Sequence, residues 1–219
     1  MFSLGKNKAP GTDGYTAEFF THCWNLVGPH LTEAVSEFFR NGKLLKEVSN
    51  TLISLIPKVQ NPSSLRDYRP ISCANVIYKC ITKILARRIK MVLPDLVGRE
   101  QTAFVPGRRA ADSILLTHEL MHLYQSRRLP ARCMLKVDLM KAFDSVDWHY
   151  LRLLLQAYGF PASMICSIME CVTSVRYSIQ INGEMVGFFP GTRGLRQGDP
   201  LSPYYLLLSW SLYRHLCEL

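Results

Sequence analysis

The chain has 219 residues, and 26 lysines and arginines against 17 aspartates and glutamates give a formal net charge of +9. Hydrophobic residues make up 48% of the sequence, which excludes wholesale disorder and is enough for a buried core. No apolar run is long enough to cross a bilayer, and the first residues lack the apolar stretch of a secretory signal. The seven cysteines form no Cys-x-x-Cys pair, so we expect reduced thiols, an intracellular protein and no disulfide-linked partner.

Hydrophobic periodicity and turn residues predict a helix-rich chain. In chain order we expect helices over 17–26 and 31–40, a strand over 51–56, helices over 75–93 and 112–124, a strand over 133–139, helices over 148–158 and 161–172, two strands within 177–189, and a helix from 202. Asn182-Gly183 is a strong signal for a tight turn between the last two strands. The pattern indicates an α+β fold with a small antiparallel sheet, because strands and helices do not alternate regularly.

The helix predicted over 75–93 carries a row of positive charges beside its apolar face. The row consists of Lys79, Lys83, Arg87 and Lys90. Like charges at this spacing repel one another, so the row is most easily kept where an anion lies along the helix. A solvated face and a nuclear-localisation cluster are the alternatives. The net charge likewise fits either a nucleic-acid partner or plain solubility.

Three further segments carry groups suited to metal or phosphate chemistry. Asp138 is expected at the end of the strand over 133–139, and carboxylates there suit Mg²⁺, although a turn role is the alternative. The glycine-rich segment 191–203 holds two arginines and leads into a helix N-terminus, which favours anions. Lys58 and Arg69 flank a chain reversal and could converge on a polyphosphate, although each alone is an ordinary surface charge.

Several blocks of residues occur in a telling order. They are Lys-Ala-Pro-Gly-Thr-Asp-Gly at 8–14, Ile-Pro-Lys at 56–58, Tyr-Arg-Pro-Ile-Ser at 68–72, Phe104-x-x-Gly107-Arg108, Lys-Val-Asp at 136–138 with Ala-Phe-Asp at 142–144, and Arg-Gln-Gly-Asp-Pro-Leu-Ser-Pro at 196–203. From Gly5 to about Leu208, this order resembles the reverse transcriptase domain of non-long-terminal-repeat (LINE-type) retrotransposons, especially those of plants. The resemblance implies a right-hand polymerase fold with fingers at 1–130, a partial palm at 131–219 and no thumb.

The resemblance also implies an RNA-directed DNA polymerase that uses Mg²⁺, an RNA template, a DNA primer and deoxynucleoside triphosphates, away from any membrane and in the nucleus. Asp138 would be the catalytic metal ligand, with the backbone carbonyl of Leu139 beside it. The expected nucleotide-binding residues are Lys58, Arg69, Phe143, Gln197 and Gly198. The expected nucleic-acid contacts are Lys79, Lys83, Arg87 and Arg108.

The sequence departs from that family in one important respect. The family completes its metal site with a Tyr/Phe-x-Asp-Asp hairpin, and no Asp-Asp pair occurs in these 219 residues. One carboxylate cannot hold two divalent ions, so we expect a chain truncated before this motif that does not polymerise alone. A catalytically dead RNA-binding remnant and a fragment that does not fold stably are the alternatives.

Overall fold

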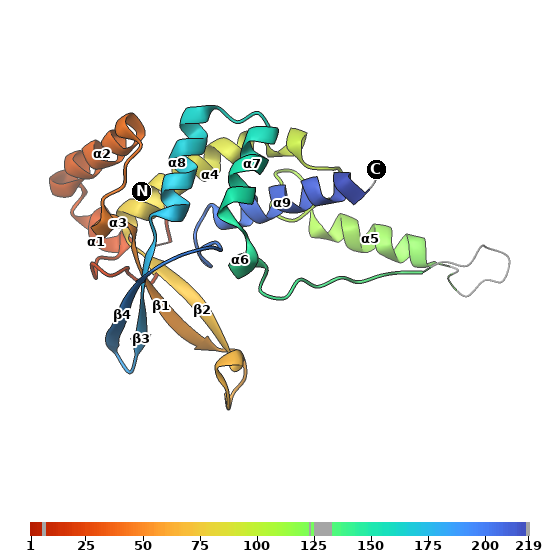
Figure 1. Ribbon diagram of the computed structural model, residues 1–219, viewed down its shortest axis with the longest axis horizontal. Coiled ribbons are helices and arrows are strands. Elements are labelled where there is room, and N and C mark those ends of the chain that lie inside the picture. The colour runs from red at the N-terminus through yellow and green to blue at the C-terminus, as the bar shows by residue number, and fades with distance from the viewer. Residues whose placement is uncertain (6–7, 123, 125–132, 218–219) are drawn as a thin grey trace.

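A computed structural model describes residues 1–5, 8–122, 124 and 133–217, with side chains up to 209 and at 211. The helices are α1 Ala17–His22, α2 Trp24–Asn41, α3 Lys46–Ser49, α4 Val76–Leu96, α5 Ala110–Met121, α6 Ala142–Ser145, α7 Trp148–Ala157, α8 Ala162–Thr173 and α9 Ser202–Cys217. The strands are β1 Asn50–Pro57, β2 Tyr68–Ala74, β3 Arg176–Ile181 and β4 Glu184–Pro190, with a short 3₁₀ helix at Leu65–Asp67. The sheet projects below a layer formed by most of the helices (Figure 1).

The chain has the expected α+β fold, and its small sheet has the strand order β2-β1-β3-β4 and is mixed, with one parallel pair beside two antiparallel pairs. β1 pairs antiparallel with β2, and β3 pairs antiparallel with β4. The central pair β1–β3 is parallel, with Asn50 opposite Arg176 and Ile53 opposite Ile179. A parallel pair requires a long crossover connection, which α4 to α8 provide. This pair also joins the two regions expected at 1–130 and 131–219, and that division remains a prediction.

The expected tight turn between β3 and β4 is confirmed. Asn182 and Gly183 have φ values of 52° and 88°, as a type I′ turn requires at both of its central residues. Most of the other expected elements form, with shifted ends. The helix expected from 31 begins at Trp24, and α4 continues through Pro94 to Leu96.

The hydrophobic core lies among four helices. α4 contributes Leu85, Ile89 and Leu93, which are fully buried, and α7, α8 and α9 pack around them. Fully buried side chains of these three helices include Leu151, Leu154, Leu155, Ile168, Tyr205 and Leu208. Within the described ranges, no helix is long and apolar enough to cross a membrane.

The strand expected over 133–139 is absent from the structure. These residues run in an irregular, extended path to α6 below α9, and their side chains are exposed (Figure 1). A strand requires a hydrogen-bonded neighbour, and the four-stranded sheet contains no partner for this segment. The strand prediction is therefore wrong for the chain as described.

Arg108 closes the end of α4, and its expected role as a nucleic-acid contact remains a prediction. Its two terminal guanidinium nitrogens donate to four backbone carbonyl oxygens, those of Pro94, Val97, Gly98 and Gln101. Carbonyls after a helix end have no partner within the helix, and a cation is favourable there. The side chain is thereby occupied in holding the segment that follows α4.

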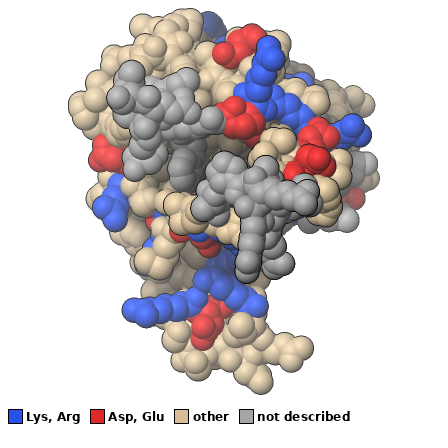
Figure 2. Space-filling view, turned by 90° about the vertical axis from the view of Figure 1, so that its right-hand side faces the viewer, with Lys and Arg blue, Asp and Glu red and all other residues tan. Residues whose placement is uncertain are grey.

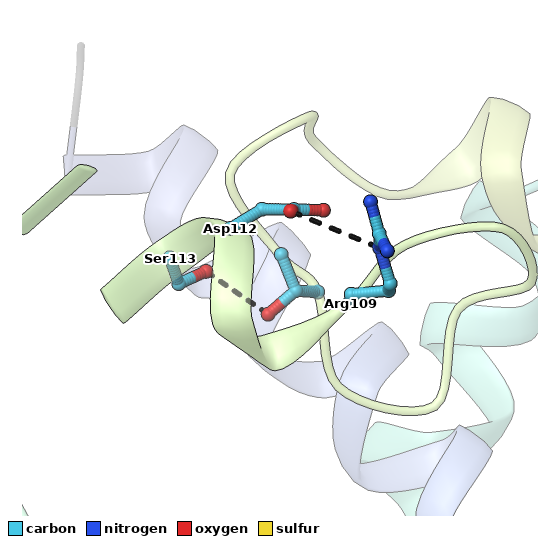
Figure 3. A network of polar contacts seen from close by, with 4 residues as sticks. Arg109, Asp112 and Ser113 are labelled. Atoms are coloured by element: carbon cyan, nitrogen blue, oxygen red, sulfur yellow. Dashed lines mark hydrogen bonds and ion pairs between the residues drawn. The ribbon is translucent and has the colours of Figure 1, made fainter. Parts of the chain in front are cut away.

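The neighbouring Arg109 is largely exposed at the start of α5. Its Nε lies 3.9 Å from Asp112 Oδ1 (Figure 3). In the next residue of α5, the Ser113 hydroxyl forms a 3.0 Å hydrogen bond with the Thr102 hydroxyl. An exposed ion pair of this length contributes little to stability. Arg109 is therefore a matched control for Arg108.

We predict that Arg108→Met lowers the free energy of unfolding by about 2–4 kcal/mol, because several carbonyls at the end of α4 lose a charged donor. Arg109→Met should change it by no more than about 0.5 kcal/mol. Urea unfolding followed by circular dichroism measures both values. Equal effects of the two substitutions would contradict the capping role of Arg108.

Candidate functional site

A cavity of about 190 Å³ opens where the sheet, α6 and the glycine-rich loop meet, and we call it the sheet–loop cavity. Its lining residues come from all four strands or their ends, from α6 and from the loop. They are Ile53, Pro70, Ser72, Asp144, Tyr177, Phe189, Arg193, Gly194, Leu195 and Gln197. The cavity therefore unites segments that the sequence places more than 140 residues apart.

The glycine-rich loop is fastened to α6 and to the start of α7. The Leu195 N–H donates to the Phe143 carbonyl at 2.8 Å, and the Gly194 N–H donates to the Val146 carbonyl at 2.8 Å. Gly194 has a φ of 85°, and a Cβ there would lie 3.0 Å from the Asp144 backbone. Only glycine fits this close approach without strain. Phe143, half-buried, is thus held directly beside the loop.

The next part of the loop is fastened to the sheet. The Ser72 N–H of β2 donates to the Gln197 carbonyl at 2.9 Å. Gly198 has a φ of 110°, and a Cβ there would lie 3.4 Å from the Ser72 carbonyl oxygen. The structure therefore places Gln197 and Gly198 against β2, three residues along the strand from Arg69. Their role toward a nucleotide remains a prediction.

Lys58 and Arg69 lie on the β1–β2 hairpin but do not line the sheet–loop cavity. Both side chains are exposed, and Lys58 Nζ donates to the Arg66 carbonyl at 2.8 Å. Arg69 lies opposite Ile56, two residues before Lys58. Lysine and arginine side chains gather on the lower part of the face shown in Figure 2, at the level of the sheet. The hairpin thus carries exposed cations, and one of its two strands, β2, also holds Gln197.

Arg196, one of the two arginines expected to suit phosphate, is buried and has a structural role instead. Only 4% of the residue is exposed. Its Nε donates to Thr51 Oγ1 at 3.1 Å, and its terminal nitrogens donate to the carbonyls of Ser49 and Cys171 at 3.0 and 2.6 Å. A guanidinium can be buried where its N–H groups find such acceptors. The phosphate interpretation of Arg196 is therefore wrong.

Tyr78 connects the buried guanidinium to a carboxylate. Arg196 donates to the Tyr78 hydroxyl and lies over its ring, with Cζ 4.2 Å from the ring centroid. The hydroxyl in turn donates to Asp199 Oδ2 at 2.7 Å. Burial raises the pKa of the Tyr78 phenol well above its ordinary value, so the group keeps the proton that it donates. Arg196, Tyr78 and the half-buried Asp199 form what we call the buried triad.

Asp138, the expected metal ligand, is exposed on the segment before α6 and does not line the sheet–loop cavity. In the described ranges, no group of three or more His, Cys, Asp or Glu residues could hold a metal ion. A divalent ion such as Mg²⁺ prefers six oxygen ligands, and one carboxylate with the Leu139 carbonyl does not supply them. The residues present therefore do not fit a complete metal site.

The row of cations on α4 is only partly open. Lys79 is half-buried, its Nζ donates to the Ala9 carbonyl at 3.1 Å, and burial lowers the pKa of its ammonium group. It fastens the 8–14 block to α4, and its expected contact with nucleic acid remains a prediction. Asn75, whose role the sequence did not indicate, also holds this block. Its side chain lies so close to Gly11 that a Cβ on Gly11 would be only 2.0 Å from Asn75 Oδ1. Lys83 and Arg87 lie farther along α4, beside a separate groove.

We predict that Arg196→Met lowers the free energy of unfolding by about 3–5 kcal/mol, because Thr51 Oγ1 and the carbonyls of Ser49 and Cys171 lose a buried charged donor. Tyr78→Phe should cost about 1–3 kcal/mol, since it removes only the bridging hydroxyl. The exposed Arg193 is the control, and Arg193→Met should cost no more than about 0.5 kcal/mol. A small effect of Arg196→Met in urea unfolding would show that the triad is dispensable.

Comparisons with known proteins identify the family. The family model described as "Reverse transcriptase (RNA-dependent DNA polymerase)" matches residues 56–210, well over half of the chain. The sequence is 34% identical over 213 residues to a Xenopus laevis protein named "Transposon TX1 uncharacterized 149 kDa protein", covering 97% of this chain and 16% of that protein.

Two insect proteins from R2 retrotransposable elements are also similar. The Drosophila melanogaster Pol polyprotein of R2DM is 28% identical over 197 residues, covering 90% of this chain and 18% of its own length. A Popillia japonica R2 Pol polyprotein is 28% identical over 224 residues, covering 98% of this chain and 29% of that protein. The chain thus spans less than a third of the length of these relatives, and the likeness to plant elements in particular remains a prediction. The chain belongs to the reverse transcriptase family, as the reverse transcriptase domain of a non-long-terminal-repeat (LINE-type) retrotransposon.

Proposed function

We propose that these residues form the template- and nucleotide-holding part of an RNA-directed DNA polymerase. The observation that carries this proposal is the contact between the Gln197 carbonyl and β2, which brings the glycine-rich loop beside the strand that bears Arg69. Nucleic-acid templates and nucleotides are the substrates of the family as a whole. An RNA template, a DNA primer and deoxynucleoside triphosphates are the specific substrates that we propose here.

In this proposal, the residues act by positioning and by charge. Lys58 and Arg69 would neutralise the phosphates of an incoming nucleotide, because both are exposed cations on one hairpin. Phe143 would support the sugar, since its backbone is bonded to Leu195 at 2.8 Å and cannot drift from the loop. Gln197 and Gly198 would support the new base pair from β2.

We propose Mg²⁺ as the metal, with Asp138 and the Leu139 carbonyl as two of its ligands. The family generally depends on metal ions for nucleotide transfer. Because the described residues do not complete a metal site, polymerisation is not proposed for these 219 residues alone. Action in the nucleus is proposed from the family resemblance only.

Purified chain should incorporate no detectable nucleotide in a primer-extension assay with an RNA template and Mg²⁺, because the carboxylates in the described part of the chain form no complete metal site. The assay should include an intact reverse transcriptase as a positive control. Incorporation by this chain that Asp138→Ala abolishes would contradict the prediction.

The second candidate function is RNA binding without catalysis, which the exposed cations favour. We predict that the affinity for a single-stranded RNA oligonucleotide falls steeply with salt, as phosphate contacts require. Replacing both Lys83 and Arg87 by Ala should raise Kd about fivefold at low salt and reduce the salt slope by about 1.4. Fluorescence anisotropy measures both quantities.

Arg152→Ala is the matched control for this experiment, because Arg152 is an exposed cation on α7. It should leave the Kd for RNA unchanged. An affinity that does not vary between low and high salt would dismiss RNA binding for this chain.

A further inference from the structure

A second hollow, separate from the sheet–loop cavity, runs between α2 and α4 and has a volume of about 470 Å³. We call it the α2–α4 groove. Its floor is apolar, with Leu31 and Val35 of α2 facing Ile84 of α4 and with Phe39 at one side. Its size falls within the range of pockets that enclose a ligand or several side chains of a partner. The groove takes no part in the proposed nucleotide site.

One wall of the α2–α4 groove is lined by three cations, Lys83, Arg87 and Arg88, all on α4. None of the groove-lining residues is an aspartate or a glutamate, and the acidic residues of α2, Glu33 and Glu37, do not line it. No carboxylate among the described residues forms an ion pair with the three cations. The groove therefore combines an apolar floor with an uncompensated positive wall.

The aromatic side chains of the groove are already covered, which disfavours base stacking there. The Arg88 guanidinium lies 5.0 Å from the Phe39 ring centroid, and the Phe38 ring meets Phe39 edge-on at 5.2 Å. Trp24 is not available either, because the Phe2 ring packs against it with the centroids 5.1 Å apart, and Gly28 lies against its indole ring. Single-stranded nucleic acid is bound on open aromatic faces. An apolar side chain, in contrast, needs only the floor.

From these features we propose that the α2–α4 groove is a docking site for an acidic amphipathic helix of a partner protein. Apolar side chains at i, i+3 or i+4, and i+7 would fill the floor, and carboxylates on one flank would face Lys83, Arg87 and Arg88. The positive wall is what selects an acidic partner over a neutral one. This inference is independent of the proposed nucleotide site, which lies at the sheet.

The test uses the whole chain and two labelled helical peptides that share one apolar face. One peptide carries glutamates on its flank and the other carries lysines at the same positions. By fluorescence anisotropy, the acidic peptide should bind and the basic peptide should not. Arg88→Glu together with Lys83→Glu should raise the Kd of the acidic peptide about tenfold or more. Arg152→Glu, a single charge reversal on α7, should leave it unchanged.

A steric variant separates the groove from charge in general. Ser36 is exposed and lines the groove, so Ser36→Trp should fill it and abolish peptide binding while leaving the circular dichroism melt unchanged. RNA binding should survive this substitution. The proposal is overturned if the acidic peptide does not bind, if both peptides bind equally, or if Ser36→Trp leaves peptide binding intact. Loss of RNA binding in Ser36→Trp without any peptide binding would instead assign the groove to nucleic acid.

Discussion

The burial of the Arg196 guanidinium is the interaction on which the arrangement of this molecule depends. It joins three segments that are distant from it in the sequence: the junction of α3 with β1, the first turn of α4 and the end of α8. Removing one partner of such a network leaves a buried charge without compensation, which is far more costly than the loss of a surface contact. The loop that carries Arg196 is therefore anchored in the core of the protein.

The position of the loop has consequences on both of its sides. On the N-terminal side of Arg196, Gly194 and Leu195 hold α6 near Phe143. On its C-terminal side, the Gln197 carbonyl contacts β2, and Asp199 accepts a hydrogen bond from the Leu201 N–H just before α9. The loop is thereby held on β2, the strand that also carries the exposed Arg69. Asp138 remains outside this framework, because the segment before α6 has no strand beside it.

Most of the fold could be predicted from local sequence patterns, because caps and turns act over a few residues. Asp147 caps α7 by accepting the Tyr150 N–H at 2.8 Å, and Asn182-Gly183 forms its turn. The parallel pairing of β1 with β3 and the burial of Arg196 could not be predicted, because both depend on contacts between residues more than 120 positions apart. Arg196 and Arg108 look like any exposed arginine in the sequence, since only the folded chain shows how many acceptors surround them. The strand expected at 133–139 has the right composition but lacks a neighbour.

The most direct test concerns the Ser72 amide, which donates to the Gln197 carbonyl on the outer edge of β2. Hydrogen exchange measured by NMR should show this amide protected in the wild-type chain and exchanging much faster in Tyr78→Phe, while amides in the middle of α8 stay protected. That result would show that the buried triad holds the loop on the sheet. Equal protection of the Ser72 amide in both proteins would contradict the account.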